Sequence, residues 1–180
     1  MKKILKLTLI LFLICAIVAG VLGVINEVTK DRIAEQNAIK TARAYASVLA
    51  SESYEEVDFD RDAFPTVDSI NRASNGTGYV VVSTFSGAQG SITMAVGVDN
   101  DYRCTGISII SHSETSGLGA NAASTSEIGV NFRAQFVGED ETVALKKAGG
   151  SIDALTGAPI TSRAVTNATA VSIAAVKSLG

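Results

Sequence analysis

An unbroken run of 19 residues without a charged side chain, residues 7–25, restricts most strongly what this chain can fold into. Helical residues rise about 1.5 Å each, so the run reaches roughly 28 Å, close to the ~30 Å hydrocarbon core of a bilayer. A cleaved secretory signal has an apolar core of only about 7–15 residues, followed by small residues at the cleavage site. Ala19, Gly20 and Gly23 resemble such a site, but the length of the run favours retention. We therefore expect residues 1–25 to form a transmembrane anchor.

The charges on either side of this run predict its orientation. Lys2, Lys3 and Lys6 precede the run, and no acidic residue does. Because positive residues beside a span stay on the cytoplasmic side, we expect a single-pass protein of the cell (inner) membrane. Its N-terminus would lie in the cytoplasm and its C-terminal domain would be extracytoplasmic.

The part of the chain beyond the run is acidic. Removing the three lysines from 15 Lys+Arg leaves 12 cations against 18 Asp+Glu, a net charge of −6. An acidic surface argues against nucleic acid as a partner and against a domain that lies flat on anionic lipid. The lipid bilayer is therefore expected to surround the anchor, and the domain is free to contact other proteins.

Two cysteines and one histidine give no basis for a metal centre. Cys15 lies in the apolar run and Cys104 far away in a strand-like run, so the two cannot pair, and no Cys-x-x-Cys spacing is present. Cys104 is expected to be a small core residue, and His112 has no partners with which to bind a metal. We predict no metal site.

Helices are predicted near both ends of the chain. Residues 26–50 carry a weak apolar stripe among charges and predict a membrane-proximal amphipathic helix. Residues 162–179 are rich in Ala and Val without Gly or Pro, and they predict a C-terminal helix. Residues 51–75 are polar and interrupted by Pro65, so we expect loops with short structured pieces.

The middle of the chain predicts a sheet. Three β-branched runs joined by tight turns, residues 78–84, 92–98 and 104–111, predict an antiparallel meander. The remaining predicted elements are a small polar segment outside the core at 113–127, a short helix at 131–136 and a short strand at 142–147. Because strands and helices are segregated along the chain, residues 51–180 are expected to form an α+β domain.

Two small-residue segments in this domain are candidates for a binding site. Residues 112–121 follow a strand directly and contain a Gly-rich loop whose backbone N–H groups are suited to face a ligand, although such a loop is also an ordinary turn. Thr156, Gly157 and Ala158 precede the last helix, where free N–H groups and the helix dipole favour a phosphate. The alternative for this second segment is simple capping, with Thr161 or Ser162 as N-cap and Pro159 before the helix.

Together the two segments carry a resemblance to a known family. The first contains Glu114-Thr115-Ser116-Gly117-Leu118-Gly119, and the second runs from Thr156-Gly157-Ala158 into Ile160-Thr161-Ser162. This combination, behind a single N-terminal anchor, resembles the FMN-binding subunit of ion-translocating redox complexes. The members are the G subunit of the Rnf ferredoxin:NAD oxidoreductase and the C subunit of the sodium-pumping NADH:quinone oxidoreductase. The resemblance favours the Rnf branch.

The resemblance implies a function and a set of site residues. In the family a flavin transferase moves FMN from FAD onto a threonine hydroxyl, and the flavin then carries electrons within the complex. The partners implied are the other membrane and peripheral subunits and the flavin transferase. Leu118 and Leu155 would lie against the flavin ring. The implied cofactor-binding residues are Glu114, Thr115, Leu118, Gly119, Leu155, Thr156, Gly157, Ala158, Thr161 and Ser162.

One position departs from the family pattern Asp-x-x-Ser/Thr-Gly-Ala-Thr/Ser. This chain has Pro159 where the family has the hydroxyl that carries FMN. Three outcomes stay open: Thr161 accepts the FMN covalently, the flavin binds without a covalent bond, or the subunit has lost its flavin and is structural. A further alternative is an anchored extracytoplasmic binding module. A pilin-like protein is disfavoured, because the apolar run lacks the early glutamate of pilins.

Overall fold

A computed structural model describes residues 2–180, and the chain divides into two compact units, residues 1–40 and 41–180. The first helix, α1 (Lys2–Val48), is continuous over both the predicted anchor and the predicted membrane-proximal helix. Its segment Lys3–Lys30 is long and apolar enough to cross a membrane, and none of it is covered by protein. The apolar run therefore fits a single-pass membrane anchor.

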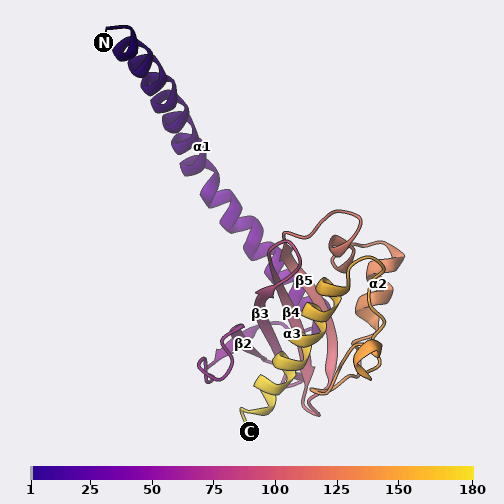
Figure 1. The fold of residues 1–180 in the computed structure, drawn as a ribbon. Helices are drawn as coiled ribbons and strands as arrows, with labels where there is room; N and C mark the ends of the chain where they lie inside the picture. The colour runs from indigo at the N-terminus through magenta and orange to yellow at the C-terminus, as the bar shows by residue number, and fades with distance from the viewer. Residues whose placement is uncertain (1) are drawn as a thin grey trace. The chain divides into compact units, whose positions relative to one another are not determined.

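The second unit is built on one sheet of five antiparallel strands in the order of the sequence. The strands are β1 (Tyr54–Val57), β2 (Val67–Ala73), β3 (Gly78–Ser86), β4 (Ser91–Asp99) and β5 (Cys104–His112). The predicted meander of the last three strands is confirmed, with tight turns between them. With its helices the domain is α+β, as predicted (Figure 1).

The prediction of loops with short structured pieces over residues 51–75 is confirmed in outline, but it did not identify these pieces as the strands β1 and β2 of the sheet. In β2 the buried residues are Val67, Ile70 and Ala73, spaced three apart rather than two. A register irregularity between Val67 and Ser69 breaks the two-residue alternation. A β-bulge of this kind hides a strand from a search for alternating polarity.

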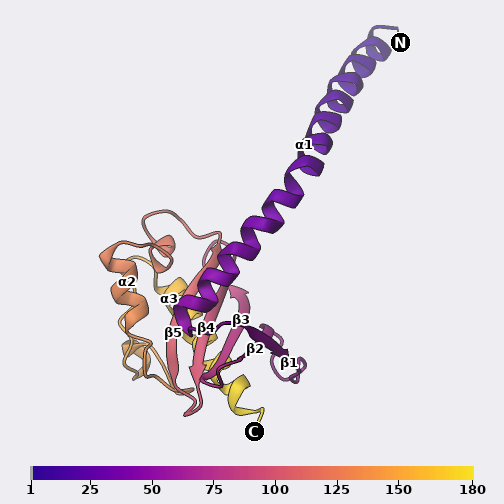
Figure 2. The ribbon, with the colours of Figure 1, turned by 180° about the vertical axis from the view of Figure 1, so that it is seen from behind.

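The two faces of the sheet are covered differently. One face packs against α2 (Glu127–Ala134) and α3 (Pro159–Lys177) and forms the larger core, which includes Met94, Phe132 and Val165. The last turns of α1 cover part of the opposite face, where Ala44 and Val48 pack on Val80 and Ala95 (Figure 2). Cys104 belongs to the larger core, as predicted.

The end of α1 approaches the sheet closely enough to bond to it. The Thr105 hydroxyl donates a hydrogen bond of 2.5 Å to the backbone carbonyl of Val48. A Cβ atom on Gly97 would lie 2.5 Å from the same carbonyl oxygen, whereas one on Gly106 would lie 3.6 Å from Val48 Cα. Gly97 is therefore required by the closeness of the helix, and Gly106 is not.

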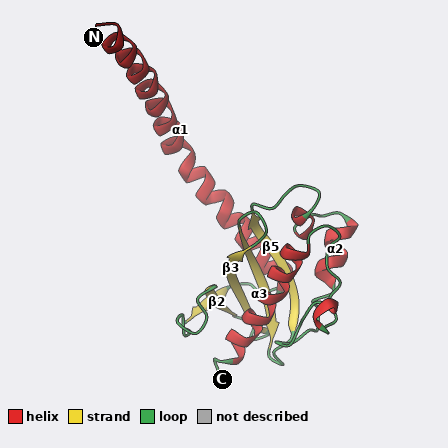
Figure 3. Cartoon of the chain, in the orientation of Figure 1, coloured by secondary structure: helices red, strands yellow, loops and turns green. Residues whose placement is uncertain are grey.

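The segments between β5 and α3 are mostly loop (Figure 3). Residues 142–147 were predicted as a strand, but only Leu145 makes a single bridge, to Ile152, and Lys146–Ala148 form the 3₁₀ turn η2. The Gly149-Gly150 pair ends any extended run, because Gly149 has a φ of 87°. The predicted short helix exists, but it begins earlier, at Glu127.

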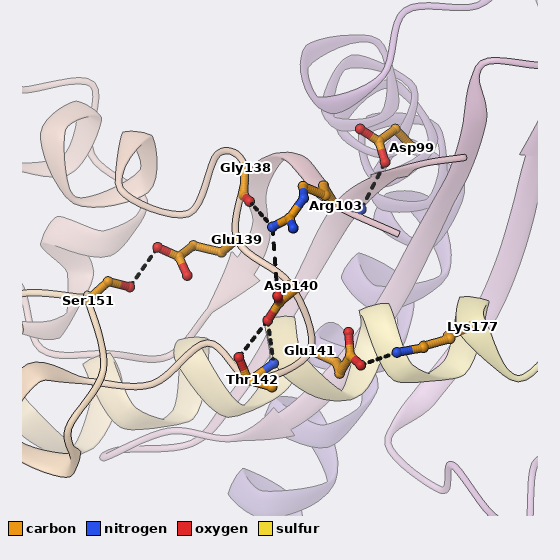
Figure 4. A network of polar contacts seen from close by, with 9 residues as sticks. All are labelled: Asp99, Arg103, Gly138, Glu139, Asp140, Glu141, Thr142, Ser151 and Lys177. Carbon is orange, nitrogen blue, oxygen red and sulfur yellow. Dashed lines mark hydrogen bonds and ion pairs between the residues drawn. The ribbon is translucent and has the colours of Figure 1, made fainter. Parts of the chain in front are cut away.

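A polar network joins this loop region to the sheet and to the end of α3 (Figure 4). Arg103 donates to the carbonyl of Gly138 at 2.9 Å and lies 3.7 Å from the Asp140 carboxylate. Lys177 near the end of α3 pairs with Glu141. Glu141 in this loop region thus holds the C-terminal end of α3. The candidate site lies at the opposite, N-terminal end of the helix.

Candidate functional site

The candidate site lies at the N-terminal end of α3, where a turn precedes the helix. Gly157 has a φ of 76°, a conformation that favours glycine, and Ala158 is the N-cap. Pro159 is the first helical residue, a position where its missing N–H breaks no helical hydrogen bond. The alternative that Thr161 or Ser162 caps the helix is therefore wrong, since the helix begins before both.

Ser162 fixes this turn from inside the domain. Its hydroxyl accepts a hydrogen bond of 2.9 Å from the N–H of Leu155 and donates one of 2.8 Å to the carbonyl of Ala158. Ser162 and Leu155 are both buried. A side chain of the helix itself therefore bridges the two sides of the turn.

A buried carboxylate joins the two sequence motifs. The Thr161 hydroxyl donates to Glu114 Oε2, while Glu114 Oε1 accepts from the N–H groups of Ala88 at 2.8 Å and Gln89 at 3.0 Å. Glu114 is 8% exposed and Thr161 is 0% exposed. The carboxylate thus ties the β3–β4 turn, the loop after β5 and the first turn of α3.

These contacts decide the charge of Glu114. Burial by itself raises the pKa of a carboxyl, but the hydrogen bonds from Thr161, Gln89 and Ala88 favour the charged form and outweigh it. The net result is a pKa of Glu114 below its ordinary value. Glu114 is therefore a charged anchoring group at neutral pH.

The Gly-rich loop is shaped by this carboxylate. A Cβ on Gly119 would collide with Glu114 Oε2 and with the Thr161 hydroxyl. The N–H groups of Leu118 and Ala120 donate to the carbonyl of Thr115, both at 3.2 Å, and are not free for a ligand. The expectation that residues 113–127 lie outside the core is also wrong in part, since Glu114 and Ala122 are buried.

The exposed side of the same region presents a mixed polar and apolar surface. Leu118 is 45% exposed, and its Cδ2 lies so close to Gly157 that a Cβ there would approach it to 2.9 Å. Thr115 and Thr156 are exposed as well. A hollow of about 490 Å³ opens beside Thr156 and Gly157, between η2 and the start of α3. It is lined by Leu145, Lys146, Lys147, Ile152, Asp153, Ala154, Leu155, Thr156, Gly157 and Pro159.

The structure therefore divides the expected site residues into two groups. A buried group forms the scaffold and consists of Glu114, Gly119, Leu155, Ala158, Thr161 and Ser162. A surface group consists of Thr115, Leu118, Thr156 and Gly157. Their roles toward a cofactor stay predictions. The sequence analysis did not single out Lys147 and Arg163, two basic residues that line a neighbouring hollow together with Pro159.

The chemistry of this surface suits a phosphorylated, partly apolar ligand. Pro159 has no hydroxyl, and the Thr161 hydroxyl is buried and already donates to Glu114. The hollow is in the size range of small-molecule sites. Among the residues from 2 to 180, no group of three or more His, Cys, Asp or Glu is placed to hold a metal ion.

Comparison with known proteins identifies the family. The family model for the FMN-binding domain matches residues 87–174, and that for the RnfG N-terminal region matches residues 1–48. The G subunit of the ion-translocating oxidoreductase complex of Methanosarcina acetivorans is 34% identical over 93% of this chain and 91% of its own length. The G subunit of the Na(+)-translocating ferredoxin:NAD(+) oxidoreductase complex of Acetobacterium woodii is 32% identical over 99% and 94%. The resemblance seen in the sequence is confirmed: this chain belongs to the family of G subunits of ion-translocating oxidoreductase complexes and carries an FMN-binding domain.

Proposed function

We propose that this chain is the membrane-anchored flavoprotein subunit that passes electrons through FMN within an ion-translocating ferredoxin:NAD oxidoreductase complex. The names of its relatives, the FMN-binding domain and the apolar helix α1 support this function. FMN, when bound, supplies the electron-transfer chemistry, and the chain's own residues bind and orient it. The remaining subunits of the complex are its protein partners.

The proposal includes an orientation in the membrane. The three lysines before the apolar run favour a cytoplasmic N-terminus and a domain on the other side of the membrane. In this orientation the FMN of the acidic domain exchanges electrons at the outer face of the complex.

We take the flavin to be held without a covalent bond, and one observation carries this choice. The position that bears the acceptor hydroxyl in the family is Pro159, which packs as the first residue of α3. The next hydroxyl, on Thr161, is 0% exposed and bonded to Glu114, so esterification there would break a buried contact. The surface beside Pro159 nevertheless keeps the hollow and the helix start that suit a flavin phosphate.

Mass and colour test this proposal on the full-length chain purified in detergent after expression with a flavin transferase. We expect the protein to show flavin absorbance, to release the flavin on acid denaturation and to have the unmodified intact mass. Pro159→Thr is expected to gain an FMN-sized mass, because the turn is already held by Ser162. Pro159→Val, which matches threonine in size but lacks the hydroxyl, is the control and should gain nothing.

Each other result has a definite meaning. An FMN-sized addition on the wild-type chain, mapped to Thr161 or Thr156, would show that the flavin is covalent. A colourless protein that does not take up added FMN would favour a structural subunit that has lost its flavin. A Pro159→Thr variant without added mass would contradict the alignment of this segment with the family motif.

A further inference from the structure

A second hollow, of about 300 Å³, also adjoins Pro159 and carries two basic residues. It is lined by Ala144, Leu145, Lys147, Ala148, Pro159, Arg163 and Asn167. Leu145, Lys147 and Pro159 also line the larger hollow, so the two are neighbours around the start of α3. A ligand in the larger hollow therefore has a route to both cations.

The two cations are free to bind a ligand. Over residues 2–180, neither Lys147 nor Arg163 makes an ion pair, whereas the adjacent Lys146 pairs with Asp153 at 2.6 Å. Both side chains are exposed. In a domain with an excess of acidic residues, two unpaired cations beside one hollow mark a local positive field.

The loop that carries Lys147 is held in place by its backbone. The N–H of Ile152 donates to the carbonyl of Ala144 at 3.1 Å, and the N–H of Lys146 donates to the carbonyl of Ile152 at 2.8 Å. A Cβ on Gly150 would collide with the Ala144 carbonyl. Lys147 therefore stands on a fixed turn, and Arg163 stands one helical turn after Pro159 on the exposed side of α3.

The charge of the FMN phosphate depends on whether it is esterified to the protein. A phosphate monoester carries about −1.5 to −2 at pH 7, whereas a phosphodiester to a threonine has one ionisable oxygen and carries about −1. A flavin that keeps its free phosphate thus brings more negative charge to the start of α3. We infer that Lys147 and Arg163 bind the phosphate monoester of FMN in the hollow beside Pro159, an inference that rests on the proposed function. Lys147 and Arg163 would thus bind the flavin phosphate by charge, whereas a relative with an acceptor hydroxyl would bind it through a covalent ester.

Flavin titration of the full-length, flavin-depleted chain in neutral detergent tests this inference. Flavin fluorescence quenching would give the Kd of FMN and of riboflavin, which lacks the phosphate. We expect FMN to bind about a hundredfold more tightly, since each hydrogen bond to a charged group contributes about tenfold or more. Lys147→Gln and Arg163→Gln should each weaken FMN binding about tenfold and leave riboflavin binding unchanged. Inorganic phosphate should compete with FMN but not with riboflavin.

Arg72→Gln is the matched control, because Arg72 is exposed on β2, outside both hollows, and has no ion pair over residues 2–180. Wild-type affinity for FMN in both Lys147→Gln and Arg163→Gln would overturn the inference and leave the proposed function standing. Equal losses for FMN and riboflavin would also overturn it, since the residues would then act on the shape of the site. If neither flavin binds the wild-type chain, the proposed function falls and the inference falls with it.

Discussion

At the scale of single residues, Glu114 decides how the site is built. A buried carboxylate is stable only when its oxygens are hydrogen-bonded, and this one accepts from Ala88, Gln89 and Thr161. Because the folded state lowers its pKa from 4.5, Glu114 stabilises the fold fully above about pH 4.5. That stabilisation is lost as the pH falls through the lower pKa of the folded state.

Substitution of Glu114 tests this role. Glu114→Ala leaves three donors without their acceptor and is expected to lower the free energy of unfolding by about 3 kcal/mol at pH 7. Glu114→Gln keeps one acceptor and should lower it by about 1 kcal/mol. Chemical denaturation at pH 7 and at pH 3.5 would measure both, with the exposed Glu55→Gln as control. The difference between wild type and Glu114→Gln should shrink at the lower pH, and a constant difference would rule out a charged Glu114.

At the scale of secondary-structure elements, the last turns of α1 pack closely against the sheet because Gly97 has no side chain. Gly97 leaves room for the carbonyl of Val48, which accepts from Thr105. The contact explains why a sheet face with few large apolar residues is still covered.

Two glycine substitutions separate this contact from a general effect on the strands. Gly97→Ala should lower the free energy of unfolding of the domain by about 1–3 kcal/mol, because its Cβ would collide with the Thr105 hydroxyl and lie 2.5 Å from the Val48 carbonyl oxygen, which are bonded to each other. Gly106→Ala, with its Cβ in ordinary contact with Val48, should be near neutral. Thermal unfolding followed by circular dichroism would show the difference. Equal losses for the two variants would contradict the proposed close fit.

The elements also show which features the sequence predicts and which it does not. The strands β3 to β5 were predictable because each is a run rich in β-branched residues and their turns are marked by Gly or Asp, and helix α3 because its segment is rich in Ala and Val without an internal Gly or Pro. Strand β2 was not, since a bulge removes its alternation. For the site, the family motifs located the right segments, but no pattern reveals that Thr161 faces Glu114 across 47 residues rather than the solvent. Such roles depend on tertiary contacts between distant segments.

At the scale of the whole molecule, charge and hydropathy separate a membrane unit from an acidic domain. None of the candidate span is covered by protein, and the three lysines at its start are the only charged side chains before Glu27. The proposed orientation places every acidic residue outside the cytoplasm. This orientation depends on how charge is distributed along the full chain and not on any single residue of the domain.

Labelling on intact cells tests this orientation. Thr125 is exposed on the domain surface, and we expect Thr125→Cys to react with a membrane-impermeant maleimide without permeabilisation. The wild-type chain is the control: burial raises the pKa of Cys104 to about 12, and Cys15 lies within the candidate span, so neither thiol should react. Reaction of Thr125→Cys only after permeabilisation would place the domain in the cytoplasm.

The placement of Pro159 also has an evolutionary consequence. Ser162 bonds across the turn before residue 159, and Thr161 bonds to Glu114 after it, so both sides of this position are held by other side chains. We therefore expect Pro159→Thr to leave the fold of this turn intact. If the proposed non-covalent binding holds, one codon change at position 159 would separate a tethered from an untethered cofactor within the same architecture.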